Sequence, residues 1–157
     1  MDLGCGTSTL ASSMAAEGFR EVVAVDFSSE AIALMREKYA TSGIKLVECD
    51  ARELGAHFRQ SYFDVVTCKA TIDSLLCFTT EEGYRNAIAS MLEIWKVLKP
   101  KGSLICFTIN TETVWTDMLL KEEQLQNRFR LVRTKRQILK GVDAEAVEIL
   151  YLRYEKI

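Results

Sequence analysis

The sequence of 157 residues has only one proline and one histidine, and it lacks any run of roughly 20 apolar residues that could cross a bilayer. His57 has no second ligand at a metal-binding spacing, so we expect no metal site. The five cysteines show no Cys-x-x-Cys spacing, which indicates free thiols in a reducing compartment. We therefore expect a cytoplasmic protein with no membrane partner, or a mitochondrial one if an upstream targeting segment is missing.

The sequence also lacks a large excess of charge of either sign. The formal net charge is −2, which provides no overall attraction to nucleic acid or to an anionic membrane. Hydrophobic residues make up 48% of the chain, enough for one substantial core in a chain of this length. We find no repeat or linker, and expect a single domain over residues 1–157.

Apolar runs alternate with helical segments along the first two thirds of the chain. Four short runs are typical of strands buried on both faces: Glu21–Asp26, Lys45–Cys49, Asp64–Cys68 and Ser103–Ile109. Three segments show helical spacing of apolar residues: Thr7–Glu17, a helix capped by Ser28 or Ser29 and closing at Gly43, and a helix that runs from a capping box at Thr79-x-x-Glu82 to Pro100.

The last third of the sequence has a different pattern. A short helix near Thr113–Glu123 precedes two predicted strands, Arg128–Leu139 and Val147–Tyr154, around a turn at Gly141-Val142-Asp143. The whole pattern predicts an α/β fold: a Rossmann-like three-layer sandwich with a mostly parallel sheet and a C-terminal antiparallel hairpin. In such folds the ligand binds at the carboxyl ends of the strands.

A glycine-rich loop follows the first few residues. Gly4 and Gly6 let the backbone approach a ligand at the start of a helix. Thr9 replaces the third glycine of a dinucleotide fingerprint, and Asp2 precedes the loop. Because a carboxylate repels phosphates but attracts a cationic amino-acid end, this loop favours a ligand such as adenosylmethionine.

Two further acids end predicted strands. Asp26 lies 20 residues after Gly6, where a carboxylate can accept hydrogen bonds from both ribose hydroxyls. Asp50 ends the next strand, and its carboxylate could accept from an adenine amino group while the Ala51 N–H reaches a ring nitrogen. Together these positions predict a nucleoside-binding site.

Four segments carry a resemblance to a known family: Asp2–Ser8, Val23–Ser28, Cys49–Arg52 and Leu98–Gly102. They resemble the successive motifs of class I S-adenosylmethionine-dependent methyltransferases, which implies S-adenosyl-L-methionine as cofactor. The residues expected to bind it are Asp2, Gly4, Gly6, Thr7, Asp26, Phe27, Asp50, Ala51 and Cys68.

A narrower resemblance involves residues 63–75. They are similar to a segment of the methyltransferase-like group that contains lysine methyltransferases acting on elongation factor 1A and on citrate synthase. This implies a protein lysine as substrate. The resemblance implies a catalytic carboxylate at the end of the fourth strand, where this chain has Cys68. We therefore predict Asp73 as the catalytic carboxylate, Lys69 as a wall of the methionine pocket and Thr71 as a hydrogen-bond donor.

The first predicted strand is short. Only Met1-Asp2-Leu3 precedes Gly4, whereas a strand usually has about five residues. We therefore hypothesise a truncated form of a longer methyltransferase, lacking most of the first strand and the upstream helix. A non-catalytic module for partner binding is the corresponding alternative.

Other functions stay open at this point. Basic residues cluster around the predicted sixth strand, which is compatible with an RNA substrate or with an acidic protein: Lys121, Arg128, Arg130, Arg133, Lys135, Arg136 and Lys140. A small-molecule substrate is a further alternative. A nicotinamide-dependent oxidoreductase shares the glycine loop and Asp26, but Thr9 and Asp2 argue against it.

Overall fold

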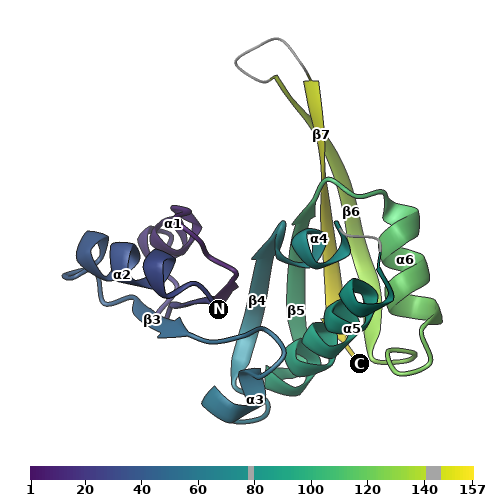
Figure 1. Cartoon of the computed structure of the whole chain (residues 1–157), viewed down its shortest axis with the longest axis horizontal. Helices are drawn as coiled ribbons and strands as arrows, with labels where there is room; N and C mark the ends of the chain where they lie inside the picture. Colours follow the sequence, from purple (N-terminus) through teal and green to yellow (C-terminus); the bar gives the residue numbers. More distant parts are fainter. Residues whose placement is uncertain (78–79, 141–145) are drawn as a thin grey trace.

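The protein, described by a computed structural model over residues 1–77, 80–140 and 146–157, contains one sheet. Within these residues the strand order is β3-β2-β1-β4-β5-β7-β6 (Figure 1). The bounds are β1 Asp2–Leu3, β2 Val23–Asp26, β3 Lys45–Glu48, β4 Phe63–Lys69, β5 Leu98–Thr108, β6 Phe129–Lys140 and β7 Ala146–Lys156. The predicted α/β class is confirmed.

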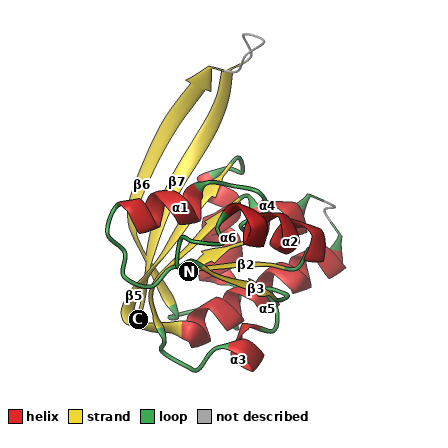
Figure 2. Cartoon of the chain, turned by 90° about the vertical axis from the view of Figure 1, so that its left-hand side faces the viewer, coloured by secondary structure: helices red, strands yellow, loops and turns green. Residues whose placement is uncertain are grey.

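Strands β1 to β5 pair in parallel, whereas β7 is antiparallel to both of its neighbours, β5 and β6. The predicted C-terminal hairpin is therefore confirmed, and its far end projects beyond the helices (Figure 2). The predicted turn at Gly141-Val142-Asp143 lies outside the described residues. Strand β5 begins at Leu98, earlier than the predicted Ser103, because Leu98 already pairs with Phe63 ahead of a register shift.

Strand β1 has two residues and pairs on both sides, with β2 and with β4. The Met1 amino group donates a hydrogen bond to the Val65 carbonyl oxygen at 2.8 Å, and the Cys5 N–H donates to the Val25 carbonyl at 2.9 Å. These bonds connect β2 and β4 through the shortest strand of the sheet.

The helices cover two faces of the sheet. Their bounds are α1 Leu10–Ala16, α2 Ser29–Lys38, α3 Leu54–His57, α4 Thr71–Leu76, α5 Glu81–Val97 and α6 Glu112–Lys121. Helices α1 and α2 lie beside β1–β3, whereas α5 and α6 lie along the β5-β7-β6 side (Figure 1). The predicted three layers are thus present. None of the described helices is both long and apolar enough to cross a membrane.

Some helices begin at other residues than predicted. Thr80, not Thr79, caps α5, because its hydroxyl accepts the Gly83 N–H at 3.0 Å; Thr79 itself lies outside the described residues. Helix α1 begins at Leu10 rather than at Thr7, since the preceding residues form the glycine loop. The short helices α3 and α4 were not predicted.

Tyr154 offers a test of the core. It is fully buried against Trp115 and Phe129, and its hydroxyl has no hydrogen-bond partner in the described part of the chain. Because an unpaired buried hydroxyl is costly, Tyr154→Phe should raise the free energy of unfolding by about 1 kcal/mol. Thermal unfolding measures the change.

Tyr39→Phe is the matched control, since the Tyr39 hydroxyl donates to Ser12 Oγ at 3.1 Å. This control should lower the melting temperature slightly or leave it unchanged. A Tyr154→Phe variant less stable than the wild type would show that the hydroxyl is hydrogen-bonded after all.

Candidate active site

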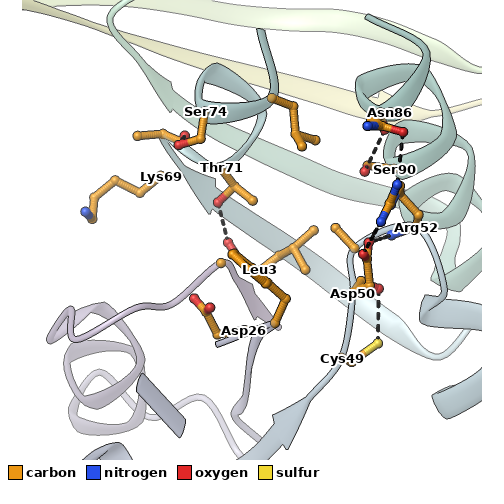
Figure 3. Close-up of a pocket in the computed structure, with 15 residues that line it drawn as sticks. Leu3, Asp26, Cys49, Asp50, Arg52, Lys69, Thr71, Ser74, Asn86 and Ser90 are labelled. Carbon is orange, nitrogen blue, oxygen red and sulfur yellow. Dashed lines mark hydrogen bonds and ion pairs between the residues drawn. The ribbon is translucent and has the colours of Figure 1, made fainter. Parts of the chain in front are cut away.

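A cavity of about 360 Å³ opens at the carboxyl ends of β1 to β4 (Figure 3). Its volume lies within the range of roughly 300–1,000 Å³ found for small-molecule sites. Several predicted residues line it: Gly4, Asp26, Phe27, Asp50, Ala51, Lys69 and Thr71. The predicted residues that do not line it are Asp2, Gly6, Thr7, Cys68 and Asp73.

The glycine loop approaches α4 closely at the edge of this cavity. Gly4 has a φ of +66°, and a Cβ there would lie 2.2 Å from Thr71 Oγ1, so a larger residue has no room. The Thr71 hydroxyl donates to the Leu3 carbonyl oxygen at 2.8 Å. Thr71 was predicted to donate a hydrogen bond in the site, and in the structure this donor holds the loop against α4.

Asp26 connects two loops at the cavity wall. Its Oδ2 accepts the Gly6 N–H at 2.7 Å, and its Oδ1 accepts the Ser28 N–H at 2.9 Å. The side chain lines the cavity although the residue is only 7% exposed. Since a carboxylate has about four acceptor positions, two remain for hydroxyl donors such as those of a ribose.

Asp50 is held by a neighbour that the sequence reasoning missed. Arg52 donates from Nε to Asp50 Oδ1 at 2.9 Å and from a terminal nitrogen to Oδ2 at 2.6 Å. These hydrogen bonds lower the pKa of Asp50. Arg52 also donates to Asn86 Oδ1 at 3.0 Å, which connects the end of β3 to α5 (Figure 3). No local sequence pattern indicated Asn86, because this residue reaches the cavity only through the packing of α5.

Asp2 lies beneath the loop rather than in the cavity. It is 1% exposed; its Oδ1 accepts the Thr67 hydroxyl at 3.1 Å, and its Oδ2 has no partner among the described residues. Burial is the main reason that its pKa is raised. Direct contact between Asp2 and a ligand stays a prediction.

Asp73 is buried and fully engaged. Its carboxylate accepts hydrogen bonds from the Thr108 hydroxyl at 2.5 Å, the Ile109 N–H at 3.1 Å and the Asn110 amide at 3.0 Å. The Trp115 indole N–H donates to the same Thr108 oxygen at 2.9 Å. Asp73 thus holds α4 against the end of β5, and this geometry favours a positioning role over the predicted catalytic one.

The end of β4 carries a thiol pair in place of a carboxylate. Cys68 Sγ lies 3.3 Å from Cys106 Sγ, and both residues are buried. Lys69 follows and lines the cavity; among the described lining residues, the carboxylates are Asp26 and Asp50. In the same part of the chain, no group of three or more His, Cys, Asp or Glu residues could hold a metal ion.

The sheet is Rossmann-like, and its glycine loop and two strand-end acids lie around one cavity. This arrangement is that of a nucleoside-binding protein of the class I methyltransferase type. The chain belongs to the methyltransferase domain family, whose profile matches residues 1–106. Membership of this family makes S-adenosylmethionine the cofactor. The free acceptor positions of Asp26 and the cavity volume fit its nucleoside end.

Three relatives are similar to this chain in sequence. EEF1A lysine methyltransferase 4 of Bos taurus is 36% identical over 113 residues, covering 68% of this chain and 44% of that protein. The mitochondrial citrate synthase-lysine N-methyltransferase of Pongo abelii is 29% identical over 123 residues, 69% of this chain and 50% of that protein. A demethylmenaquinone methyltransferase of Staphylococcus aureus is 32% identical over 120 residues, 73% and 44% respectively.

Fold similarity extends along almost the whole chain. A methyltransferase from Methanosarcina mazei that depends on S-adenosylmethionine superposes with a TM-score of 0.76 at 16% identity, covering 99% of this chain and 91% of that one. The likeness in fold thus covers nearly all of this chain, whereas by sequence the chain spans half or less of the length of the three relatives.

Asp26 should control cofactor affinity. Replacing Asp26 with Ala removes acceptors for the ribose hydroxyls, and a hydrogen bond to a charged group contributes about 1.5–3 kcal/mol. We expect the affinity for adenosylhomocysteine to fall about 10- to 100-fold in calorimetric titration. Glu48→Gln, an exposed change at the end of β3, should bind as the wild type does. Equal affinity in all three proteins would contradict the assignment of Asp26.

Asp73→Asn tests the positioning role. An amide cannot accept all three hydrogen bonds, so we expect the free energy of unfolding to fall by about 2 kcal/mol. Adenosylhomocysteine should still bind well below the melting temperature. Asp64→Asn, at an exposed ion pair with Lys99, should change stability little. Unchanged stability of Asp73→Asn would refute the role.

Proposed function

We propose that this chain acts in the transfer of a methyl group from S-adenosylmethionine to a lysine side chain of a protein. The observation that carries the proposal is the cavity itself, in which Asp26 and Asp50 are available to a nucleoside while Lys69, Thr71 and Ser74 form another wall. Similarity to two lysine methyltransferases supports a lysine as the acceptor. Catalysis by this chain, which spans 44% of the bovine relative, is part of the proposal.

The cofactor supplies a methyl group bound to a positively charged sulfur. For the transfer, the amine nitrogen of the substrate forms a bond to the methyl carbon while the carbon–sulfur bond breaks and its electron pair stays on sulfur. The chain has to position the amine and exclude water. Leu3, Gly4 and Thr71 shape the wall that can do so.

The amine must arrive without its extra proton, and its reference pKa is about 10.4. A nearby positive charge lowers that pKa, so the Lys69 ammonium at the cavity would favour the neutral amine together with the sulfonium. Asp26 and Asp50 already accept hydrogen bonds from the chain. We therefore assign the released proton to solvent rather than to a carboxylate base.

A small molecule is the second candidate acceptor. The similarity to a demethylmenaquinone methyltransferase, at 32% identity, favours it as the alternative. The cavity itself does not distinguish an amine from another small nucleophile, because its two lining carboxylates, Asp26 and Asp50, already accept hydrogen bonds from the chain.

The acceptor can be identified by isotope labelling. The chain is incubated with methyl-labelled S-adenosylmethionine and a cell lysate, with the Asp26→Ala variant as control. We expect label in protein, located on methylated lysine by mass spectrometry, and at least a tenfold lower yield with the variant at subsaturating cofactor, in line with the affinity loss above. Label confined to the lipid extract would support the small-molecule alternative instead.

A further inference from the structure

Helix α5 presents a polar stripe to the segment that follows β3. Its members, Asn86, Ser90 and Glu93, lie four and three residues apart and therefore share one face of the helix. Ser90 is fully buried and donates to the Asn86 carbonyl oxygen at 2.9 Å, and Glu93 is only 9% exposed. Buried polar side chains are costly unless they form hydrogen bonds, so the side chains of Asn86 and Glu93 need partners from outside the helix.

Two residues of the facing segment are such partners. The Gly55 N–H donates to Glu93 Oε2 at 2.7 Å, and a Cβ at Gly55 would lie 3.0 Å from that oxygen. Three residues earlier, Arg52 donates to Asn86 Oδ1 at 3.0 Å (Figure 3). The segment is thus held against α5 at two points, and Asp50 lies at its start, two residues after the end of β3.

Arg52 also occupies most of the Asp50 carboxylate. Asp50 Oδ1 accepts the main-chain N–H of Arg52 at 2.8 Å and its Nε–H at 2.9 Å, while Oδ2 accepts a terminal N–H at 2.6 Å. Since a carboxylate has about four acceptor positions, one remains, on Oδ2. Both residues line the cofactor cavity. The carboxylate therefore offers the ligand a single acceptor and cannot rotate without breaking hydrogen bonds to Arg52.

The contribution of this contact to the stability of the fold is small. The side chains of Arg52 and Asp50 are 46% and 33% exposed, and an ion pair in contact with water contributes little to the free energy of unfolding. What the planar guanidinium provides is geometry, because its fixed fork of N–H groups matches a carboxylate at both oxygens. Substitution of Arg52 should therefore change the orientation of Asp50 and leave the fold intact.

We propose that Arg52 is a positioning residue that makes the cavity select adenine as the base of the cofactor, by fixing the Asp50 carboxylate. An exocyclic amino group, such as that of adenine, can donate to the one free acceptor of Asp50. In hypoxanthine an oxygen replaces this amino group, and the adjacent ring nitrogen carries a hydrogen. The fixed carboxylate would face that oxygen without a hydrogen bond, so such a base should bind weakly. The proposal concerns the cofactor alone and holds for either methyl acceptor.

The direction of the selectivity distinguishes this role from a direct contact between Arg52 and the base. A guanidinium only donates hydrogen bonds, so an arginine that contacted the base itself would favour the oxygen of hypoxanthine over the amino group of adenine. A carboxylate released from Arg52 would be free to turn and accept the ring N–H of hypoxanthine. Loss of Arg52 should therefore reduce the preference for adenine.

The test compares two ligands on four forms of the full chain. The ligands are S-adenosylhomocysteine and S-inosylhomocysteine, in which hypoxanthine replaces adenine. The forms are the wild type, Arg52→Gln, Arg52→Lys and Arg85→Gln. Arg52→Lys keeps the positive charge but not the fork. Arg85→Gln, the control, removes an exposed ion pair with Glu81 from the same helix that carries Asn86. Calorimetric titration gives the dissociation constants, and their ratio is the selectivity.

We expect the wild type to bind the adenosyl ligand about 10- to 100-fold more tightly, as one hydrogen bond to a charged group implies. The ratio should fall by roughly fivefold or more in both Arg52 variants and stay unchanged in the control. A purely structural role would weaken both ligands equally and leave the ratio as it is, which would overturn the proposal. Equal binding of the two ligands by the wild type, or a full ratio in Arg52→Lys, would overturn it as well. Binding requires no methyl transfer, so the outcome is independent of the labelling experiment.

Discussion

The contact between the glycine loop and α4 determines where the cavity walls lie. Gly4 has no Cβ, which allows the Thr71 side chain to lie against the loop and its hydroxyl to reach the Leu3 carbonyl. Two residues further on, Asp73 holds the other side of α4 to the end of β5. Helix α4 is thus fixed between the first and fifth strands of the chain. The position of each lining residue from Lys69 to Leu75 depends on these two attachments.

Much of the fold could be predicted because its signals are local. Apolar runs such as residues 21–26 and 64–68 correspond to β2 and β4, and the capping Ser28 lies where the pattern placed a cap. Helices α3 and α4, with four and six residues, are too short to show a repeating apolar spacing. The cap of α5 lies one residue after the predicted one, because two threonines are adjacent in the sequence and the local pattern does not distinguish them; the Thr80 hydroxyl accepts the Gly83 N–H.

The site was predictable where it depends on strand ends and not where it depends on packing. Asp26 and Asp50 line the cavity because parallel strands end at one edge. Asp73 was predicted as catalytic from its place in the chain, but its three partners are 35 to 37 residues away and come from β5 and the loop after it. Asn86 reaches Arg52 across 34 residues for the same reason. Such contacts depend on tertiary packing, so no recognisable spacing of residues in the sequence indicates them.

The antiparallel strand β7 lies between β5 and β6, although it comes after both in the chain. Among the described strands, β6 pairs only with β7. During synthesis, β6 therefore leaves the ribosome with no strand to pair with, and its twelve residues stay exposed until residues 146–156 follow. Lys and Arg along an unpaired strand discourage pairing with other chains. The basic residues of β6 therefore lower the tendency of this strand to pair with other chains during this interval.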